Sequence, residues 1–122
     1  AWHEGRRSNA ADYDAKLSGL PGVTTPAISE DCWSIYNQYT LRFSGGRRDQ
    51  VFEGLKQRGI GCDIYYPIPL HLQECYLPLG GKVGDLPNAE AAAKEVLSIP
   101  VYPELTEDQR DEVVGAIKEL AG

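Results

Sequence analysis

The residue types best suited to chemistry gather in one short stretch, YYPIPLHLQ, which spans residues 65–73. It holds two tyrosines, two prolines and one of the two histidines of the chain. Proline fixes its own φ and restricts the residue before it, so the prolines on either side of Ile68 should hold His71 in a set place. An imidazole titrates near neutral pH, so His71 could contact a ligand or carry a proton. The alternative is a loop histidine that satisfies local backbone groups.

Two other clusters offer weaker chemistry. The run SGGRR at 44–48 presents backbone N–H groups and two guanidinium groups that could bind a phosphate. It lacks the residue order of a nucleotide P-loop, and a solvated turn explains it better. A zinc site built from His71, Cys32, Cys62 and Cys75 would lack the paired short spacings of structural zinc sites. The cysteines are more simply interpreted as small buried hydrophobes.

Length, charge and composition restrict the class of protein. A chain of 122 residues is the size of one domain with one core, so we expect a single domain over residues 1–122. The net charge of −6 opposes nonspecific attraction to nucleic acid or anionic lipid, and no window approaches the length of a membrane span. Three cysteines without a C-x-x-C pair, and no secretory signal, fit the cytoplasm.

The elements that must position the 65–73 stretch begin with a helix in the first twenty residues, ending near Ser18. Alternating apolar and polar residues then predict a half-buried strand from Cys32 to Phe43, with the Tyr36 hydroxyl on its polar face. A second helix is expected over 47–58. A short strand over 60–66 should follow and end at the next proline.

The second half of the chain predicts a long connection over 74–88, a third helix over 89–97, an extended piece over 98–102 and a last helix. Thr106 and Gln109 form the capping box of that last helix. In an extended strand Tyr65 and Tyr66 point to opposite faces, so at most one shares a cavity with the polar face of the first strand. The other is expected in the core. The order of elements predicts an α+β fold.

The order of motifs carries a resemblance along the whole chain. The motifs are N-A-x2-Y-x3-L ending at residue 17, W-S-I-Y-N-Q-Y-T at 33–40, R-D at 48–49, G-I at 59–60, Y-Y-P-I-P-L-H-L-Q at 65–73, G-D-L-P-N-A-E at 84–90 and L-S-I-P-V-Y-P-E-L at 97–105. In this order they resemble the C-terminal domain of the DegT/DnrJ/EryC1/StrS family. These are pyridoxal-phosphate-dependent (PLP-dependent) aminotransferases that act on nucleotide-linked keto sugars. The Pro-Leu-His-Leu-Gln run is the most specific motif.

The resemblance implies a small mixed, largely antiparallel sheet covered by helices, as in the small domain of fold-type I aminotransferases. It implies PLP, glutamate, a nucleotide-linked keto sugar and a homo-oligomer for the complete enzyme. The lysine that holds PLP belongs to the large domain, so we expect this chain alone to bind no PLP and to hold no catalytic residue. The positions that match substrate-binding ones are His71, Tyr66, Gln73, Tyr36 and Gln38.

A second hypothesis is a free-standing binding or dimerisation domain derived from a gene fragment and without catalytic activity. The chain contains no methionine, and its first helix opens at Trp2 without a capping residue. We therefore expect a piece of a longer protein, with the first helix continuing from a large domain. Apolar surface around Trp2 and Tyr13 would then be exposed and favour self-association.

Overall fold

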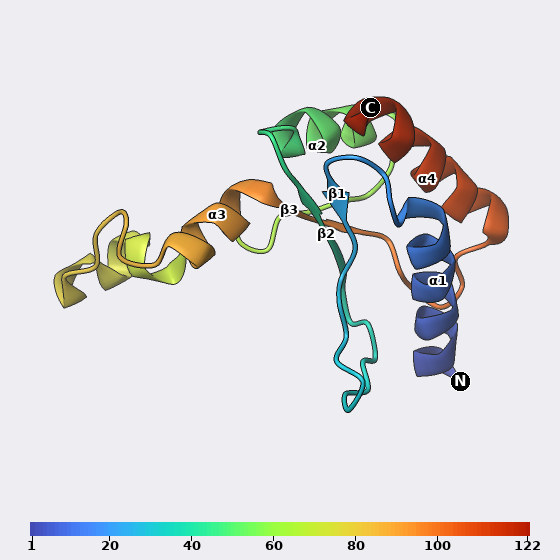
Figure 1. Cartoon of the computed structure of the whole chain (residues 1–122), viewed down its shortest axis with the longest axis horizontal. Helices are drawn as coiled ribbons and strands as arrows, with labels where there is room; N and C mark the ends of the chain where they lie inside the picture. Colours follow the sequence, from blue (N-terminus) through green and yellow to red (C-terminus); the bar gives the residue numbers. More distant parts are fainter.

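The computed structural model describes all 122 residues. Its helices surround a small sheet (Figure 1). The helices and strands are α1 (Trp2–Leu17), β1 (Val23–Thr24), β2 (Tyr39–Phe43), α2 (Arg48–Gln57), the 3-10 helices η1 (Leu70–Leu72) and η2 (Glu74–Leu79), α3 (Pro87–Glu95), β3 (Val96–Ile99) and α4 (Glu107–Ala121). The sheet is antiparallel throughout, in the order β1-β2-β3.

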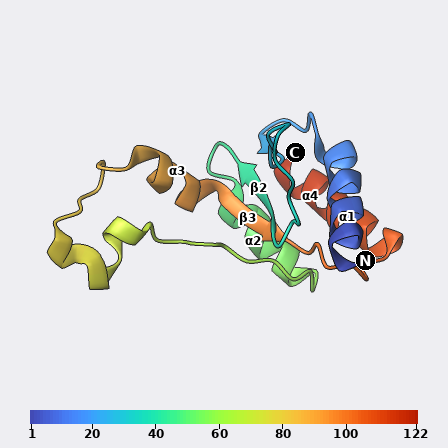
Figure 2. The ribbon, with the colours of Figure 1, turned by 90° about the horizontal axis from the view of Figure 1, so that it is seen from below.

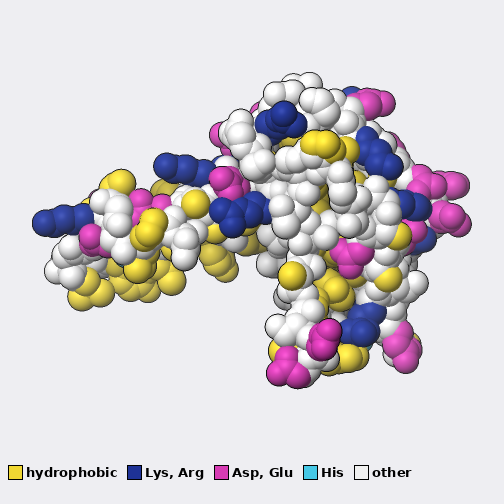
Figure 3. Space-filling model, in the orientation of Figure 1, with side chains coloured by type: hydrophobic (Ala, Val, Ile, Leu, Met, Phe, Trp, Pro, Cys, Tyr) yellow, Lys and Arg dark blue, Asp and Glu magenta, His cyan; other side chains and the backbone are white.

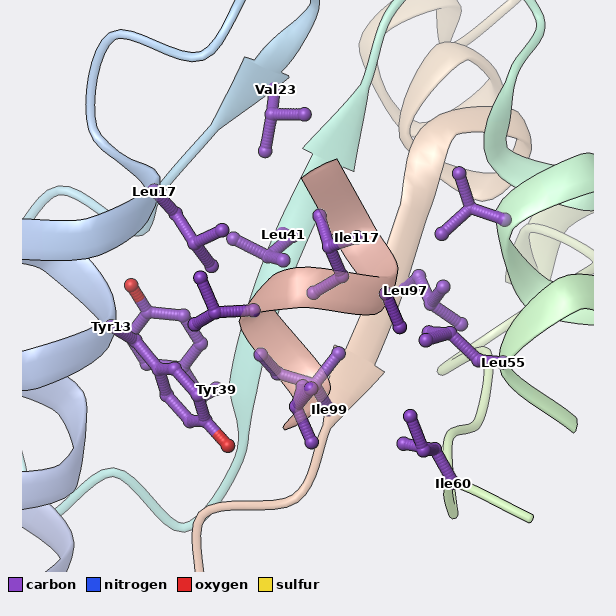
Figure 4. Packing of buried hydrophobic residues seen from close by; sticks show 14 of the residues in the cluster. Tyr13, Leu17, Val23, Tyr39, Leu41, Leu55, Ile60, Leu97, Ile99 and Ile117 are labelled. Carbon is purple, nitrogen blue, oxygen red and sulfur yellow. The ribbon is translucent and has the colours of Figure 1, made fainter. Parts of the chain in front are cut away.

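One face of the sheet forms the core. Along β2 the side chains of Tyr39, Leu41 and Phe43 are buried, as the alternation of a half-buried strand requires. Helices α1, α2 and α4 cover this face with Leu17, Leu55 and Ile117 among other apolar residues (Figure 4). The core cluster contains 19 buried residues, none of which lies between Val23 and Tyr39 or between Ile60 and Leu97, so these two parts of the chain owe little to apolar packing.

Polar contacts fix α1 against the chain that leaves β3, and a local cap begins α4. In α1, the amide of Asn9 donates to the carbonyl of Tyr102 at 2.7 Å, and the Tyr13 hydroxyl donates to the carbonyl of Pro100 at 2.9 Å. Helix α4 begins with the expected capping box, in which Thr106 and Gln109 satisfy each other's backbone N–H groups. The predicted start of α4 is therefore confirmed.

Two segments project from this body. We call residues 65–86 the arm; it holds η1 and η2 and returns to the sheet through α3 (Figures 1 and 2). The arm carries exposed apolar side chains, including Leu79 (83% exposed) and Val83 (80% exposed). Hydrophobic side chains gather along its lower side in Figure 3. We call residues 25–38, which join β1 to β2, the finger.

The strand predicted from Cys32 to Phe43 was wrong over its first seven residues, which belong to the finger. Strand β2 begins only at Tyr39, which pairs with Ile99 at the end of β3. Tyr36 has a positive φ of 46°, which interrupts extended backbone before that point. The alternation of the predicted strand would place Trp33 on its buried face, but Trp33 is 62% exposed.

Other expectations also need correction. The strand predicted over 60–66 is reduced to one isolated bridge, Asp63 to Ser98, because the chain turns away toward the arm. The third helix ends at Glu95, since the apolar residues after it are drawn into β3 and pair with β2. The connection predicted over 74–88 contains η2 and the start of α3.

The burial expected for several side chains also differs from what the structure shows. Cys32 and Cys75 are exposed, which contradicts the expectation that they are buried, whereas Cys62 is half-buried and packs against the core. Around the first helix, Trp2 is exposed as expected, but Tyr13 is fully buried. The apolar surface of α1 is therefore smaller than the sequence suggested.

Candidate functional site

The first hollow lies beside the C-terminal end of β3 and has a volume of about 390 Å³. It is lined by residue 6, residues 37–38, residues 61–65 except 64, and residues 98–102. Gln38 and Tyr65 are among these residues, so two segments far apart in the sequence meet here. Arg6 adds a charged group whose Nε is buried and has no hydrogen-bond partner. A buried N–H without an acceptor is unfavourable, so this hollow suits a ligand that brings an acceptor.

His71 lies elsewhere, in η1 on the arm. It lines a second hollow of about 420 Å³ together with Leu70, Tyr76, Leu79 and Gly81. Its Nε2 is 3.1 Å from Oε1 of Glu90, and each of these two side chains is only 12% exposed. The imidazole is thus held by a carboxylate nineteen residues further along the chain.

The contact with Glu90 is therefore a firmer basis for the predicted set place of His71 than the two prolines before it. Glu90 was missed as a functional candidate. The available signal was its position as the last residue of the G-D-L-P-N-A-E motif, within the first turn of α3. A carboxylate at this end of a helix is favoured by the helix dipole and by unpaired backbone N–H groups.

The other predicted residues on the arm are more open. Tyr66 is 67% exposed and packs edge-on against Tyr65, which is 43% exposed. The expectation that one of these tyrosines lies in the core was therefore wrong. Gln73 lies between η1 and η2, and its amide donates to the carbonyl of Ile68 at 3.4 Å. Only Tyr65 of the tyrosine pair lines the hollow beside β3.

The two residues predicted on the first strand lie in the finger. Tyr36 packs its ring on Tyr39 with centroids 6.0 Å apart. Burial and the Asp14 carboxylate raise the pKa of Tyr36, against a smaller opposite effect of Arg7. Gln38 lines the hollow beside β3, whereas His71 lines the hollow on the arm. The five predicted residues are therefore not gathered around one cavity, because finger and arm project separately (Figures 1 and 2).

The SGGRR run is a turn into α2 whose two arginines are used inside the chain. Arg48 is buried and donates through Nη1 to the carbonyls of Ala93 and Val96 at 2.9 and 3.0 Å. Arg47 donates to the carbonyl of Ala121. These contacts favour the turn interpretation over phosphate binding. No three His, Cys, Asp or Glu side chains lie close enough together to hold a metal ion, and no helix has the length and apolar character needed to cross a membrane.

Comparison with known proteins identifies the family of this chain. The family model described as the DegT/DnrJ/EryC1/StrS aminotransferase family matches residues 1–118. The chain belongs to this family. It is 45% identical over 121 residues to a pleiotropic regulatory protein of Geobacillus stearothermophilus, covering 98% of this chain and 32% of that protein. It is 36% identical over 121 residues to the dTDP-3-amino-3,4,6-trideoxy-alpha-D-glucose transaminase of Streptomyces venezuelae, covering 99% and 31%.

Solved structures agree with the family assignment. The crystal structure of S. venezuelae DesV in complex with a ketimine intermediate has a TM-score of 0.93 and 37% identity, covering 98% of this chain and 32% of that one. The TlmJ aminotransferase of Streptoalloteichus hindustanus has a TM-score of 0.86 at 32% identity, covering 98% and 31%. The predicted fold class, that of the C-terminal domain of fold-type I aminotransferases, is confirmed. The chain spans about a third of the length of the relatives it matches.

PLP is the cofactor of this family of aminotransferases, and it needs an amine and groups that hold its ring and phosphate. The hollow beside β3 is lined by Arg6 and Asp63 but by no lysine. Lys94 lines a smaller hollow of about 140 Å³ with Glu90, whose carboxylate is already engaged by several donors. These residues do not form a complete PLP site by themselves.

Proposed function

We propose that the chain is the small domain of a PLP-dependent aminotransferase that moves the amino group of glutamate to a nucleotide-linked keto sugar. The observation that supports this most is the agreement with DesV over 98% of the chain at a TM-score of 0.93. The transaminase name of the S. venezuelae relative supports the substrate class. In this proposal the lysine and the other PLP-binding groups come from outside these residues, and the chain alone is inactive.

The contribution of this chain is a substrate-binding wall with two parts. Gln38 brings an amide to the hollow beside β3, where the unpaired Arg6 Nε favours an acceptor on the ligand. On the arm, His71 offers a ring nitrogen and the exposed Tyr66 offers an aromatic face. Tyr36 on the finger and Gln73 on the arm complete the proposed set of substrate-binding residues. The complete enzyme acts in the cytoplasm, without nucleic-acid or membrane partners.

The exposed apolar side chains of the arm support a homo-oligomer. Exposed apolar groups that cluster on one segment are typical of surfaces covered by another protein surface. Leu79 and Val83 are the most exposed apolar residues of the arm. The same feature fits a free-standing dimerisation domain, so the experiment must separate the two.

The test grafts this chain onto the S. venezuelae transaminase in place of its matching third. We expect the chimera to transfer an amino group from glutamate to the keto sugar of that enzyme, and the 122-residue chain alone, given PLP and glutamate, to show no turnover. His71→Ala in the chimera should lower kcat/KM roughly tenfold, the size of one hydrogen bond. His3→Ala, at the exposed second histidine, is the control and should leave kcat/KM unchanged.

Two results would count against the proposal. One is turnover by the 122-residue chain alone. The other is a folded chimera that binds PLP but transfers no amino group while the parent enzyme is active. An inactive chimera together with a stable dimer of the chain alone, seen by sedimentation, would favour the dimerisation domain.

A further inference from the structure

Glu90 collects three hydrogen-bond donors at the base of the arm. Its Oε1 accepts from the backbone N–H of Gly84 at 2.8 Å, from that of Leu86 at 3.3 Å, and lies 3.1 Å from His71 Nε2. Its Oε2 is a further 3.0 Å from the Gly84 nitrogen. Burial raises the pKa of Glu90, but these donors outweigh burial and hold the pKa below its usual range. The carboxylate is therefore ionised and acts only as an acceptor.

The contact with Glu90 decides which imidazole nitrogen carries the proton. An ionised carboxylate has no hydrogen to donate, so His71 Nε2 must be the donor of this pair. In the neutral imidazole the second nitrogen, Nδ1, then keeps its lone pair and is an acceptor. Glu90 thus sets the protonation of Nδ1, although it contacts the ring only at Nε2.

His71 Nδ1 has no partner within the chain. It is buried and makes no hydrogen bond. The hollow that His71 lines contains Leu70, Tyr76, Leu79 and Gly81, and neither arginine nor lysine. An anion would lose its hydration there without meeting a cation, whereas a hydroxyl or amide N–H needs only one acceptor.

The backbone of His71 is restrained as well. A Cβ added at Gly81 would lie 2.6 Å from the His71 carbonyl oxygen and 3.1 Å from its Cβ. The chain after η2 therefore passes directly against His71 on one side, and Glu90 holds the ring on the other. The arm and the first turn of α3 together set both the place and the orientation of the imidazole.

We propose that Glu90 is a positioning residue that fixes His71 as the Nε2–H tautomer, which leaves Nδ1 as an unpaired acceptor suited to a neutral donor group of the ligand. Where the ligand is the nucleotide-linked sugar of the proposed function, on which this last step rests, the group is a hydroxyl and not a phosphate. The tautomer itself does not depend on that function.

The tautomer can be read from long-range proton–nitrogen NMR spectra of the histidine-labelled 122-residue chain at about pH 8, where an ordinary imidazole is neutral. The chain has only two histidines, so His3→Gln assigns both sets of signals. His3 faces the edge of Trp33 and pairs with no carboxylate, so it serves as the internal reference. We expect protonated Nε2 and unprotonated Nδ1 for His71, and a mixture of tautomers for His3.

Two variants on α3 test the role of Glu90. Glu90→Ala should turn His71 into a mixture of tautomers like that of His3. Glu95→Ala, which removes a carboxylate of the same helix that pairs with Arg42, should leave the His71 tautomer unchanged. A protonated Nδ1 or a mixture at His71 in the unaltered chain would overturn the proposal. So would an unchanged tautomer in Glu90→Ala.

The chimera described above supplies a functional measurement. Glu90→Ala and His71→Ala should each lower kcat/KM roughly tenfold, and the double variant should lose no more than either alone, because both remove one shared interaction. Full additivity would contradict the positioning role. A folded chimera that binds PLP but transfers no amino group would remove the proposed function and leave the tautomer result standing.

Discussion

Replacing Arg48 with Met tests how α3, and with it the arm, is attached to the sheet. The Arg48 side chain is 8% exposed, and its Nη1 donates to the carbonyls of Ala93 and Val96. The Ala93 carbonyl lies in the last turn of α3, where carbonyls lack partners within the helix. Methionine keeps an unbranched apolar chain in the same place but donates no hydrogen bond.

The expected loss follows from the partners left behind. A buried carbonyl without a donor costs about 1–3 kcal/mol, and here there are two, of which the Val96 carbonyl is only partly buried. The pair between Arg48 and Asp49 adds at most about 1 kcal/mol, because the Asp49 side chain is 81% exposed. We expect Arg48→Met to lower the free energy of unfolding by about 2–4 kcal/mol, a large part of what a domain of this size has.

Urea denaturation followed by circular dichroism measures this free energy. The matched control is Arg42→Met, since the Arg42 side chain is 51% exposed and pairs only with Glu95 at the surface. That variant should cost less than about 1 kcal/mol. If Arg48→Met costs no more than Arg42→Met, the two carbonyls do not depend on Arg48 and the reasoning is refuted.

Two further predictions concern α1. Burial raises the pKa of Asp12, but hydrogen bonds from Arg110 and Lys16 outweigh it and hold the pKa below its ordinary value of 3.8. The stabilisation from Asp12 is therefore present above about pH 4 and is lost as the pH falls through the lower folded-state pKa. Asp12→Asn should flatten the decline of the free energy of unfolding below about pH 4, measured by urea denaturation. An identical decline in the variant would contradict this. Tyr13→Phe removes the bond to the Pro100 carbonyl and should cost about 1–2 kcal/mol by urea denaturation, whereas Tyr102→Phe, at a half-exposed ring, should cost less than about 0.5. A loss below about 0.5 kcal/mol in Tyr13→Phe would show that the bond of the buried hydroxyl contributes little.

The helices could be predicted well because their ends are set by local residues. Gly59, with a φ of 74°, closes α2, and the capping box of Thr106 and Gln109 opens α4. The strands were predicted too long because the alternation of apolar and polar residues depends on one segment alone, whereas backbone hydrogen bonding in a sheet also needs a neighbouring strand. Strand β1 contains two residues, so β2 has few groups to pair with on that side.

The site shows the same division between local and long-range information. Two prolines and a histidine within a few residues were enough to single out His71, and its placement near a hollow is consistent with that choice. Its partner Glu90 is nineteen residues away, and the carbonyls that engage Arg48 are 45 and 48 residues away. No periodicity relates such positions, because they meet only through the folding of the intervening chain. Proline and glycine patterns therefore located the arm but could not reveal what holds it.

Helix α3 explains why these two polar side chains matter together. It has nine residues and one buried residue, Ala93, so neither its length nor its apolar packing would keep it folded alone. Arg48 holds its C-terminal end, and Glu90 ties its first turn to the loop before it and to His71. Because α3 joins the arm to the sheet, the position of the arm depends on directional hydrogen bonds more than on apolar burial.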